Sequence, residues 1–328
     1  MRRHAVTAPE SGAWEEDVKE IKGIILPLPT PFKADGEVDE ALGCALADFE
    51  IGAGINALFL LGSFGQGPVM RLDQRQSYLE TIVRHVRGRV PIIVHVGTAD
   101  VFSTIELALH AKSVGVDAIA VVGPYYYSDH TEYEVIEHFK EVGERVAMPM
   151  LVYNNAEYSG YDITPPLMLK LHQEVPTIFG TKLSTNSFET ALRYLAQMPK
   201  DFAVFGLSSS FMPAALYGIR GTIVPPQSSY PELAVSLWRA IEARNLEEAM
   251  TIQMIINELS QTTSRLGRIY GRAVQCEALR LRGFAIERFP RWKTKSLSDA
   301  DREVLRAALA KAGVPVGSSS ASREHQMA

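Results

Sequence analysis

The stretch VPIIVHVGTADVFSTIELALHAKSVGVDAIAVV, residues 90–122, holds one complete repeat of the pattern that decides the fold. Its two ends, residues 90–96 and 116–122, are almost continuous in valine, isoleucine and alanine. Between them, residues 101–114 carry apolar side chains at helical spacing. Near-continuous apolar runs are typical of parallel strands that are buried on both faces. The stretch therefore predicts a strand, a helix and a second strand parallel to the first.

The same unit recurs along the first 224 residues. Further apolar runs lie at 22–28, 55–61, 149–153, 177–182, 202–205 and 221–224, and helical patterns lie at 40–52, 72–86, 132–146, from 164, 187–198 and 211–218. Eight strand–helix units in about 210 residues match a closed (β/α)8 barrel better than an open doubly wound sheet. Because no GxGxxG or Walker sequence follows any of these runs, a nucleotide-binding fold is disfavoured. We predict a TIM barrel.

Beyond residue 230 only helical patterns remain, at 232–244, 246–265, 272–283 and 298–312. Ser298 is expected to cap the last helix, with Asp299 and Asp301 in its first turn. The predicted organisation is an N-terminal extension at 1–20, a barrel at 21–229, a C-terminal helical subdomain at 230–314 and a disordered, Ser-rich tail at 315–328. Residues 14–20 are expected to form a short helix that covers the floor of the barrel.

Composition excludes several classes of function. The chain has 328 residues, is 46% hydrophobic and carries 33 basic against 38 acidic residues, so no basic excess indicates nucleic acid or a membrane surface. It has no apolar run of about 18 residues and no secretory signal pattern. Cys44 and Cys276 form no CxxC pair and are interpreted as free thiols in a reducing compartment. We expect a cytoplasmic protein.

The carboxyl ends of the strands are where a barrel of this kind places its active site. Small, hydroxyl-bearing and phenolic residues end the predicted strands, and a single lysine, Lys182, stands among them. A lysine at the end of a buried strand loses hydration, which lowers the pKa of its ammonium group. The neutral amine can then attack a carbonyl and form a Schiff base. A lone lysine in this position more often extends its charged end to the surface, so its neighbours decide between the two interpretations.

Two further patterns bear on the chemistry. No metal-ligand grouping is apparent at the strand ends, and His95, which has no carboxylate cluster beside it, is interpreted as structural. The motifs PTPF at 29–32, GSFG at 62–65, PYYY at 124–127, LVYNN at 151–155 and GTK at 180–182 follow one another in this order. Over residues 21–312 this order and spacing resembles the dihydrodipicolinate synthase / N-acetylneuraminate lyase family of class I Schiff-base aldolases.

The resemblance implies a role for specific residues. Lys182 would form an imine with pyruvate or another 2-oxo acid, and Tyr153 would relay protons. Ser63 and Tyr126 would complete the relay, with Tyr126 supplied by a neighbouring subunit of a dimer or tetramer. The residues that the resemblance or the strand ends place against the substrate are Gly62, Phe64, Gly65, Asn155, Tyr158, Gly206 and Ile223. No metal or organic cofactor is implied.

Independent chemistry supports these residue types. A phenol within hydrogen-bond reach can shuttle the protons of carbinolamine formation and dehydration. Glycine allows main-chain N–H groups to approach a carboxylate closely. The alternatives are a packed aromatic side chain for Tyr153 and ordinary turn chemistry for Ser63.

Some positions depart from the family pattern. Phe64 and Gln66 replace a hydroxyl residue and a glutamate, and Tyr158 stands where the synthase branch has an arginine that grips a carboxylate. These changes argue against lysine-biosynthetic dihydrodipicolinate synthesis and against a polyol such as sialic acid. Asn155 is similar to the asparagine of hydratase-aldolases that cleave aryl-substituted pyruvate adducts. Phe64 and Tyr158 favour a less polar distal group.

We predict a lysine Schiff-base lyase for which the small-molecule partners are a 2-oxo acid and an aldehyde. The predicted reaction is reversible aldol cleavage to pyruvate, with an apolar or aryl aldehyde as the second product. A dehydratase or aldolase of 2-keto-3-deoxy sugar acids is the nearest alternative, because the same imine supports loss of water. A non-catalytic, ligand-binding barrel is the alternative from another class.

Overall fold

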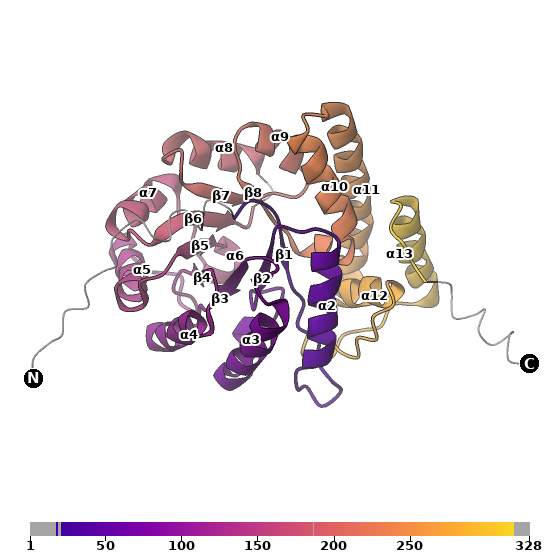
Figure 1. Ribbon diagram of the computed structural model, residues 1–328, viewed down its shortest axis with the longest axis horizontal. Coiled ribbons are helices and arrows are strands. Elements are labelled where there is room, and N and C mark those ends of the chain that lie inside the picture. Colours follow the sequence, from indigo (N-terminus) through magenta and orange to yellow (C-terminus); the bar gives the residue numbers. More distant parts are fainter. Residues whose placement is uncertain (1–17, 19–20, 186, 318–328) are drawn as a thin grey trace, which may run out of the picture.

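The computed structural model describes residue 18 and residues 21–185 and 187–317 (Figure 1). Its parallel strands close into a barrel in the order β1 to β8, each pairing with the next and β8 pairing with β1. The strands are β1 (Gly23–Pro27), β2 (Ala57–Leu60), β3 (Ile92–His95), β4 (Ala118–Val122), β5 (Met150–Asn154), β6 (Ile178–Leu183), β7 (Ala203–Gly206) and β8 (Gly221–Ile223). The predicted (β/α)8 barrel is confirmed.

Helices surround the strands and connect each one to the next (Figure 1). They are α2 (Glu40–Gly52), α3 (Leu72–Val86), α4 (Val101–Val114), α5 (Glu132–Val146), α7 (Pro165–Glu174), α8 (Phe188–Gln197) and α9 (Phe211–Leu216). A short helix, α6 (Ala156–Ser159), and two 3-10 turns, η1 (Gly67–Val69) and η2 (Pro225–Ser229), follow β5, β2 and β8. These three short elements therefore lie at the carboxyl ends of strands, beside the expected site.

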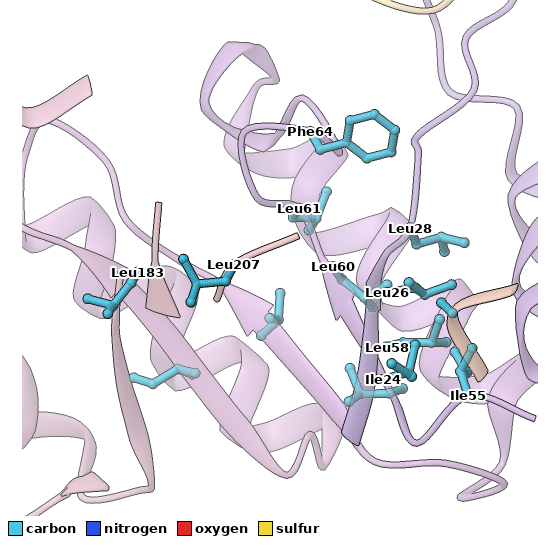
Figure 2. Close-up of a cluster of buried hydrophobic side chains, with 14 of the residues drawn as sticks. Ile24, Leu26, Leu28, Ile55, Leu58, Leu60, Leu61, Phe64, Leu183 and Leu207 are labelled. Carbon is cyan, nitrogen blue, oxygen red and sulfur yellow. The ribbon is translucent and has the colours of Figure 1, made fainter. Parts of the chain in front are cut away.

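The barrel has two apolar layers because side chains alternate along each strand. Ile24 and Leu26 of β1 point outward and join Leu58 and Leu60 of β2 against the helices (Figure 2). Ile25 points inward instead, into a second buried cluster that fills the interior. That interior cluster also contains Val18, which is described as helical, whereas the rest of the helix expected at 14–20 lies outside the described residues.

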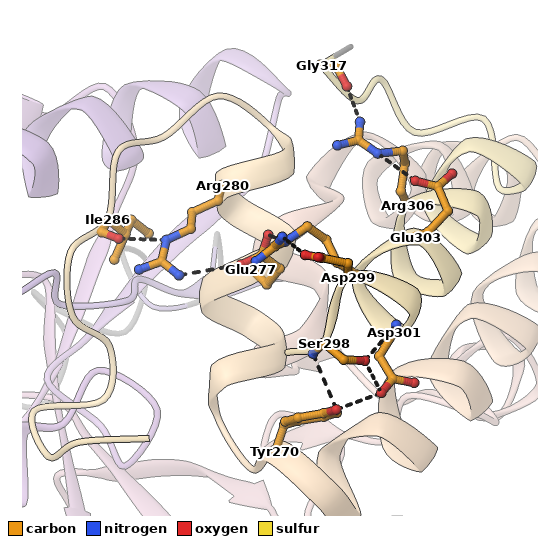
Figure 3. A network of polar contacts seen from close by, with 11 residues as sticks. Tyr270, Glu277, Arg280, Ile286, Ser298, Asp299, Asp301, Glu303, Arg306 and Gly317 are labelled. Atoms are coloured by element: carbon orange, nitrogen blue, oxygen red, sulfur yellow. Dashed lines mark hydrogen bonds and ion pairs between the residues drawn. The ribbon is translucent and has the colours of Figure 1, made fainter. Parts of the chain in front are cut away.

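The C-terminal helices form a group beside the barrel (Figure 1). They are α10 (Pro231–Glu242), α11 (Leu246–Tyr270), α12 (Ala273–Leu281) and α13 (Asp299–Lys311). The predicted cap of the last helix is confirmed, because the Ser298 hydroxyl accepts a hydrogen bond from the Asp301 N–H at 3.1 Å. The Tyr270 hydroxyl donates to the Asp301 carboxylate at 2.6 Å and joins α11 to this cap (Figure 3). Helix α11 extends five residues past its predicted end at 265.

The segment between α12 and α13 returns to the barrel. Arg288 and Phe32 exchange two main-chain hydrogen bonds of 3.0 and 3.1 Å. The Arg291 guanidinium donates to the Val69 carbonyl at 3.1 Å and to the Gln74 side chain at 2.9 Å. These bonds hold the C-terminal subdomain over the loop that follows β2, so that subdomain can contribute side chains to the strand ends.

The tail expected at 315–328 lies partly within the described residues. Residues 315–317 are described, and the Gly317 N–H donates to the Leu281 carbonyl at 2.8 Å. Residues 318–328 lie outside the described residues. Among the helices of the described ranges, none has both the length and the apolar character needed to cross a bilayer.

Candidate active site

Lys182 lies near the end of β6, inside the barrel. It is 5% exposed, and its register partner on β5 is Tyr153. Because paired residues of neighbouring parallel strands project to the same side, both side chains enter the same space. The Lys182 Nζ atom is 3.6 Å from the centroid of the Tyr153 ring and donates to the Ser184 hydroxyl at 3.3 Å. Strand β6 ends at Leu183, one residue later than expected.

The two groups change each other's acidity. Burial lowers the pKa of the Lys182 ammonium, and the neighbouring Tyr153 opposes that change. Burial alone would raise the pKa of the Tyr153 phenol, but the charge of Lys182 and hydrogen bonds from Ser63, Ser184 and Asn155 outweigh it and lower the pKa to about 7. Near neutral pH, therefore, the phenol can both give and take a proton, and the amine loses its proton more readily than an exposed lysine does.

The Tyr153 hydroxyl is the centre of a small hydrogen-bond network. It lies 3.3 Å from the Ser63 hydroxyl and accepts a hydrogen bond from the Asn155 carboxamide nitrogen at 3.1 Å. The rings of Tyr153 and His95 pack edge-to-face, with 5.7 Å between the ring centroids. Burial, reinforced by the charges of Arg75 and Lys182, holds the pKa of His95 well below its usual range, so its imidazole is neutral.

The loop after β2 brings Ser63 to this network. The buried Thr30 holds the main chain of this loop, because its hydroxyl donates to the Gly65 carbonyl at 2.6 Å. Gln66, with a φ of 62°, donates to the Ser63 carbonyl at 3.3 Å and accepts a hydrogen bond from the Arg291 N–H at 3.4 Å. Gln66 thus ties down the loop from within and links it to the C-terminal subdomain.

Phe64 supplies apolar surface, as expected. Its ring packs edge-to-face against Phe289, with 5.2 Å between the centroids, and the residue also lines the cavity over Lys182. Figure 2 shows Phe64 at the end of the apolar layer that begins with Ile24 and Leu26. The side chain therefore joins the loop after β2 to the C-terminal segment.

Two cavities meet above the strand ends. The larger, of about 390 Å³, is lined by Lys182 with Phe64, Asn155, Ser184, Thr185, Leu207, Ser208, Ile223 and Gln275. The second, of about 350 Å³, is lined by His95, Val122, Tyr125 and Trp292, among others. Both are lined by Ser63, Tyr153, Glu157, Tyr158 and Arg272. Shared walls make them adjoining compartments, which we call the lysine compartment and the aromatic compartment.

Asn154 positions the loop that carries Asn155 and Tyr158. Its carboxamide nitrogen donates to the Asp162 carboxylate at 2.8 Å and to the Ile163 carbonyl at 3.0 Å, and its oxygen accepts from the Ile163 N–H at 3.1 Å. The same nitrogen lies 2.8 Å from the Tyr194 hydroxyl. Buried, multiply bonded amides of this kind fix a loop in one conformation.

The structure brings together most, but not all, of the residues expected at the site. Lys182, Tyr153, Ser63, Phe64, Asn155, Tyr158 and Ile223 line the compartments. Gly62 and Gly65 lie in the loop around Ser63, and Gly206 serves packing, because a Cβ there would stand 2.7 Å from the Leu183 carbonyl oxygen. Tyr126 is 84% exposed and lines neither compartment, whereas its neighbour Tyr125 lines the aromatic one.

Several residues that line the compartments were not predicted from the sequence. Arg272, Gln275 and Trp292 come from the C-terminal subdomain, for which only helices were predicted. His95 was interpreted as structural; it is buried, but it also forms a wall of the aromatic compartment. Within the described ranges, no group of three or more histidine, cysteine, aspartate or glutamate side chains could hold a metal ion.

Known proteins are similar to this chain over most of its length. The model of the dihydrodipicolinate synthetase family matches residues 20–312. The chain is 30% identical to the probable 2-dehydro-3-deoxy-D-pentonate aldolase YjhH of Escherichia coli K12 over 246 residues, 74% of this chain and 81% of the relative. It is 29% identical to the N-acetylneuraminate lyase of Rhizobium meliloti over 291 residues, 88% of this chain and 95% of the relative.

A solved structure is similar over nearly the whole chain. The crystal structure of YagE, a protein of the dihydrodipicolinic acid synthase family from Escherichia coli K12, was determined in complex with pyruvate. It superposes with a TM-score of 0.83 at 27% identity and covers 90% of this chain and 99% of its own.

Proposed function

This chain belongs to the dihydrodipicolinate synthetase family and is a carbon–carbon lyase, and on that premise we propose that it works through a Schiff base on Lys182. The proposed reaction is the reversible cleavage of a 2-oxo acid to pyruvate and an apolar or aryl aldehyde. The observation that carries the proposal is the buried Lys182 amine, 3.6 Å from the centre of the Tyr153 ring, in the wall of a 390 Å³ compartment.

The first step joins the enzyme and the 2-oxo acid. The Lys182 amine attacks C2, and the resulting carbinolamine loses water to leave an iminium ion. The Tyr153 phenol gives a proton to the departing hydroxyl, and Ser63, 3.3 Å away, extends the relay. The proposed seat of the substrate carboxylate is the main chain of the loop at 62–65, where glycines permit close approach.

Cleavage then uses the iminium as an electron sink. The Tyr153 phenolate takes the proton of the C4 hydroxyl, the C3–C4 bond breaks, and its electron pair moves toward the iminium nitrogen to form an enamine. The aldehyde departs. Protonation of the enamine at C3 and hydrolysis of the imine release pyruvate and restore the Lys182 amine.

An unsaturated substrate would first require water at C4. The Asn155 carboxamide nitrogen donates a hydrogen bond to the Tyr153 hydroxyl. The buried carboxamide oxygen of Asn155 has no hydrogen-bond partner among the described residues. We propose that this oxygen orients a water that adds to C4 of the conjugated iminium. The water proton passes to the Tyr153 phenolate, and the electrons of the C3–C4 double bond form the enamine, which is then protonated at C3.

The choice of an apolar or aryl aldehyde rests on the aromatic compartment. Val122, Tyr125, Tyr158 and Trp292 line the space beyond Tyr153, where the part of the substrate after C4 would extend. Aromatic walls favour a flat, apolar group through buried area and ring contacts.

A second candidate is the cleavage or dehydration of a 2-keto-3-deoxy sugar acid. The relative named as a 2-dehydro-3-deoxy-D-pentonate aldolase supports it. So do the hydroxyl-bearing residues Ser184, Thr185 and Ser208 in the lysine compartment, which could bond to a substrate polyol.

One assay separates these proposals. Benzylidenepyruvate and 2-dehydro-3-deoxy-D-pentonate would be supplied in parallel, and pyruvate release would be measured for the wild type and for Lys182→Ala. We expect release from the aryl substrate by the wild type alone. Faster release from the sugar acid would favour the second candidate, and release from neither would exclude both of these substrates.

The proposed assembly is a dimer or tetramer in the cytoplasm. Tyr126, at 84% exposure, is available to complete the site of a second copy. Cys44 and Cys276 are both free thiols, which supports a reducing compartment. No metal or organic cofactor takes part in the proposed steps.

A further inference from the structure

Arg272 brings a positive charge into the cleft from the C-terminal subdomain. It stands directly before α12, is partly buried, and lines both compartments. Three other arginines of this subdomain, Arg280, Arg282 and Arg302, each pair with a glutamate. Within the described ranges, Arg272 takes part in no ion pair, and its side chain forms a hydrogen bond with that of Tyr158. A guanidinium has five N–H donors, so others remain to receive an anion that enters the cleft.

The side chains around Arg272 leave part of its hydrogen-bonding capacity available to an anion. Burial raises the pKa of the Tyr158 phenol, and the charge of Arg272 and a hydrogen bond with its side chain oppose the rise, so the two groups are in contact. Glu157 also lines both compartments, but it is exposed and, within the described part of the chain, forms no ion pair with Arg272. The charge of Glu157 is therefore more strongly screened by solvent than that of the partly buried Arg272.

The positions of the lining residues indicate which part of the substrate meets Arg272. Lys182 lines the lysine compartment, Trp292 lines the aromatic one, and Arg272 stands in the wall that they share. Since C2 must bond to Lys182, the atoms beyond C4 extend past Tyr153 toward the aromatic compartment. A group at the far end of the substrate would then come within reach of the guanidinium.

We infer that the aldehyde partner is itself an acid, with a carboxylate on an apolar or aryl frame, and that Arg272 binds this carboxylate. The planar guanidinium can donate two parallel hydrogen bonds to a carboxylate, while the aromatic walls bind the frame. This inference rests on the proposed cleavage to pyruvate and an aldehyde, and it names the class of the second product.

The test compares matched aldehydes in the condensation direction with pyruvate. The ortho, meta and para formylbenzoates would each be paired with the corresponding formylbenzamide, which has the same shape without the charge. We expect the wild type to prefer at least one formylbenzoate by about 10- to 100-fold in kcat/KM, the range for a hydrogen bond to a charged group. Arg272→Met should remove this preference, and Arg272→Lys should restore part of it.

The control variant is Arg268→Met, which removes an exposed arginine from α11 outside the linings of both compartments. It should keep the wild-type preference. Glu157→Gln should strengthen the preference a few-fold, because it removes a like charge near the bound carboxylate. An equal loss of activity on both aldehydes in Arg272→Met, or a loss confined to the KM for pyruvate, would overturn the inference.

A binding measurement keeps the inference separate from the catalytic proposal. In the Lys182→Ala protein, which cannot form an imine, calorimetry should show tighter binding of the preferred formylbenzoate than of its amide. Adding Arg272→Met should abolish that difference. Equal binding of acid and amide would refute the inference even where the wild type cleaves 2-oxo acids. A clear difference in a wild type that releases no pyruvate would refute the cleavage proposal alone.

Discussion

Tyr153 and Lys182 show how a single contact sets the acidity of both groups. The phenol and the amine are each buried, which would disfavour either charge alone. Placed together, the ammonium stabilises the phenolate, and hydrogen bonds from Ser63 and Asn155 add to that effect. The pair can therefore exchange protons near neutral pH, which an isolated tyrosine with a pKa of about 10 could not do.

This acidity predicts a pH profile. Below the pKa of about 7 the Tyr153 phenol is protonated and cannot take the proton of the C4 hydroxyl, so kcat/KM for retro-aldol cleavage should rise with pH through about 7. Tyr153→Phe should lower kcat by about 10²- to 10⁴-fold and remove this rising limb. Stopped-flow cleavage rates measured from acidic to alkaline pH, for the wild type and for Tyr153→Phe, would give both pH profiles. A limb that persists in Tyr153→Phe would assign the titration to another group.

At the scale of elements, the strand ends were predictable and the contacts between distant elements were not. Tyr153 and Lys182 could be paired from the sequence because each ends an apolar run, and parallel strands place such ends at one face. Arg272 and Trp292 could not be placed. Helical periodicity identifies an apolar face, but it does not say where α12 and the segment after it dock.

Asn154 and Asn155 provide a matched test of the loop after β5. Asn154→Ala should lower the free energy of unfolding by about 2–4 kcal/mol, because it leaves the buried Ile163 N–H without its acceptor and removes several hydrogen bonds at once. Asn155→Ala removes the hydrogen bond to the Tyr153 hydroxyl in the wall of the lysine compartment and should impair hydration of an unsaturated substrate with less loss of stability. Urea unfolding of both variants checks this. Equal stability losses would contradict the assigned roles.

Glu50 sets a pH dependence for the whole molecule. Burial raises the pKa of this α2 carboxyl to about 8, and Ser228, whose hydroxyl also donates to the Pro27 carbonyl at 2.8 Å, opposes the rise. In the unfolded chain the carboxyl ionises near its ordinary pKa of 4.5. Between these values the native state holds a proton that the unfolded state has lost, so the free energy of unfolding should fall as pH rises, by up to about 1.4 kcal/mol per pH unit.

Glu50→Gln isolates this effect. The variant keeps the shape and removes the ionisation, so it should be more stable than the wild type at pH 8 and show little difference at pH 5. Thermal unfolding at the two pH values measures the change. A wild type whose stability relative to Glu50→Gln does not vary with pH would show that Glu50 does not titrate in this window.

Assembly is the other property of the whole molecule that bears on the site. Tyr126 and Tyr127 are both exposed and their rings touch edge-to-face, with 5.1 Å between the centroids. If Tyr126 completes the relay of a second copy, Tyr126→Phe should lower kcat by about 10- to 100-fold without changing the melting temperature. Tyr127→Phe is the matched control and should retain activity. Wild-type turnover in Tyr126→Phe would remove Tyr126 from the relay.

The proposed function depends on an imine on Lys182. The most direct test is the intact mass of the protein after borohydride reduction in the presence of pyruvate, for the wild type beside Lys182→Ala. We predict that the wild type gains one reduced pyruvyl group per chain, that peptide mapping places it on Lys182, and that the variant gains nothing. An unmodified wild type, or an adduct that survives in Lys182→Ala, would contradict it.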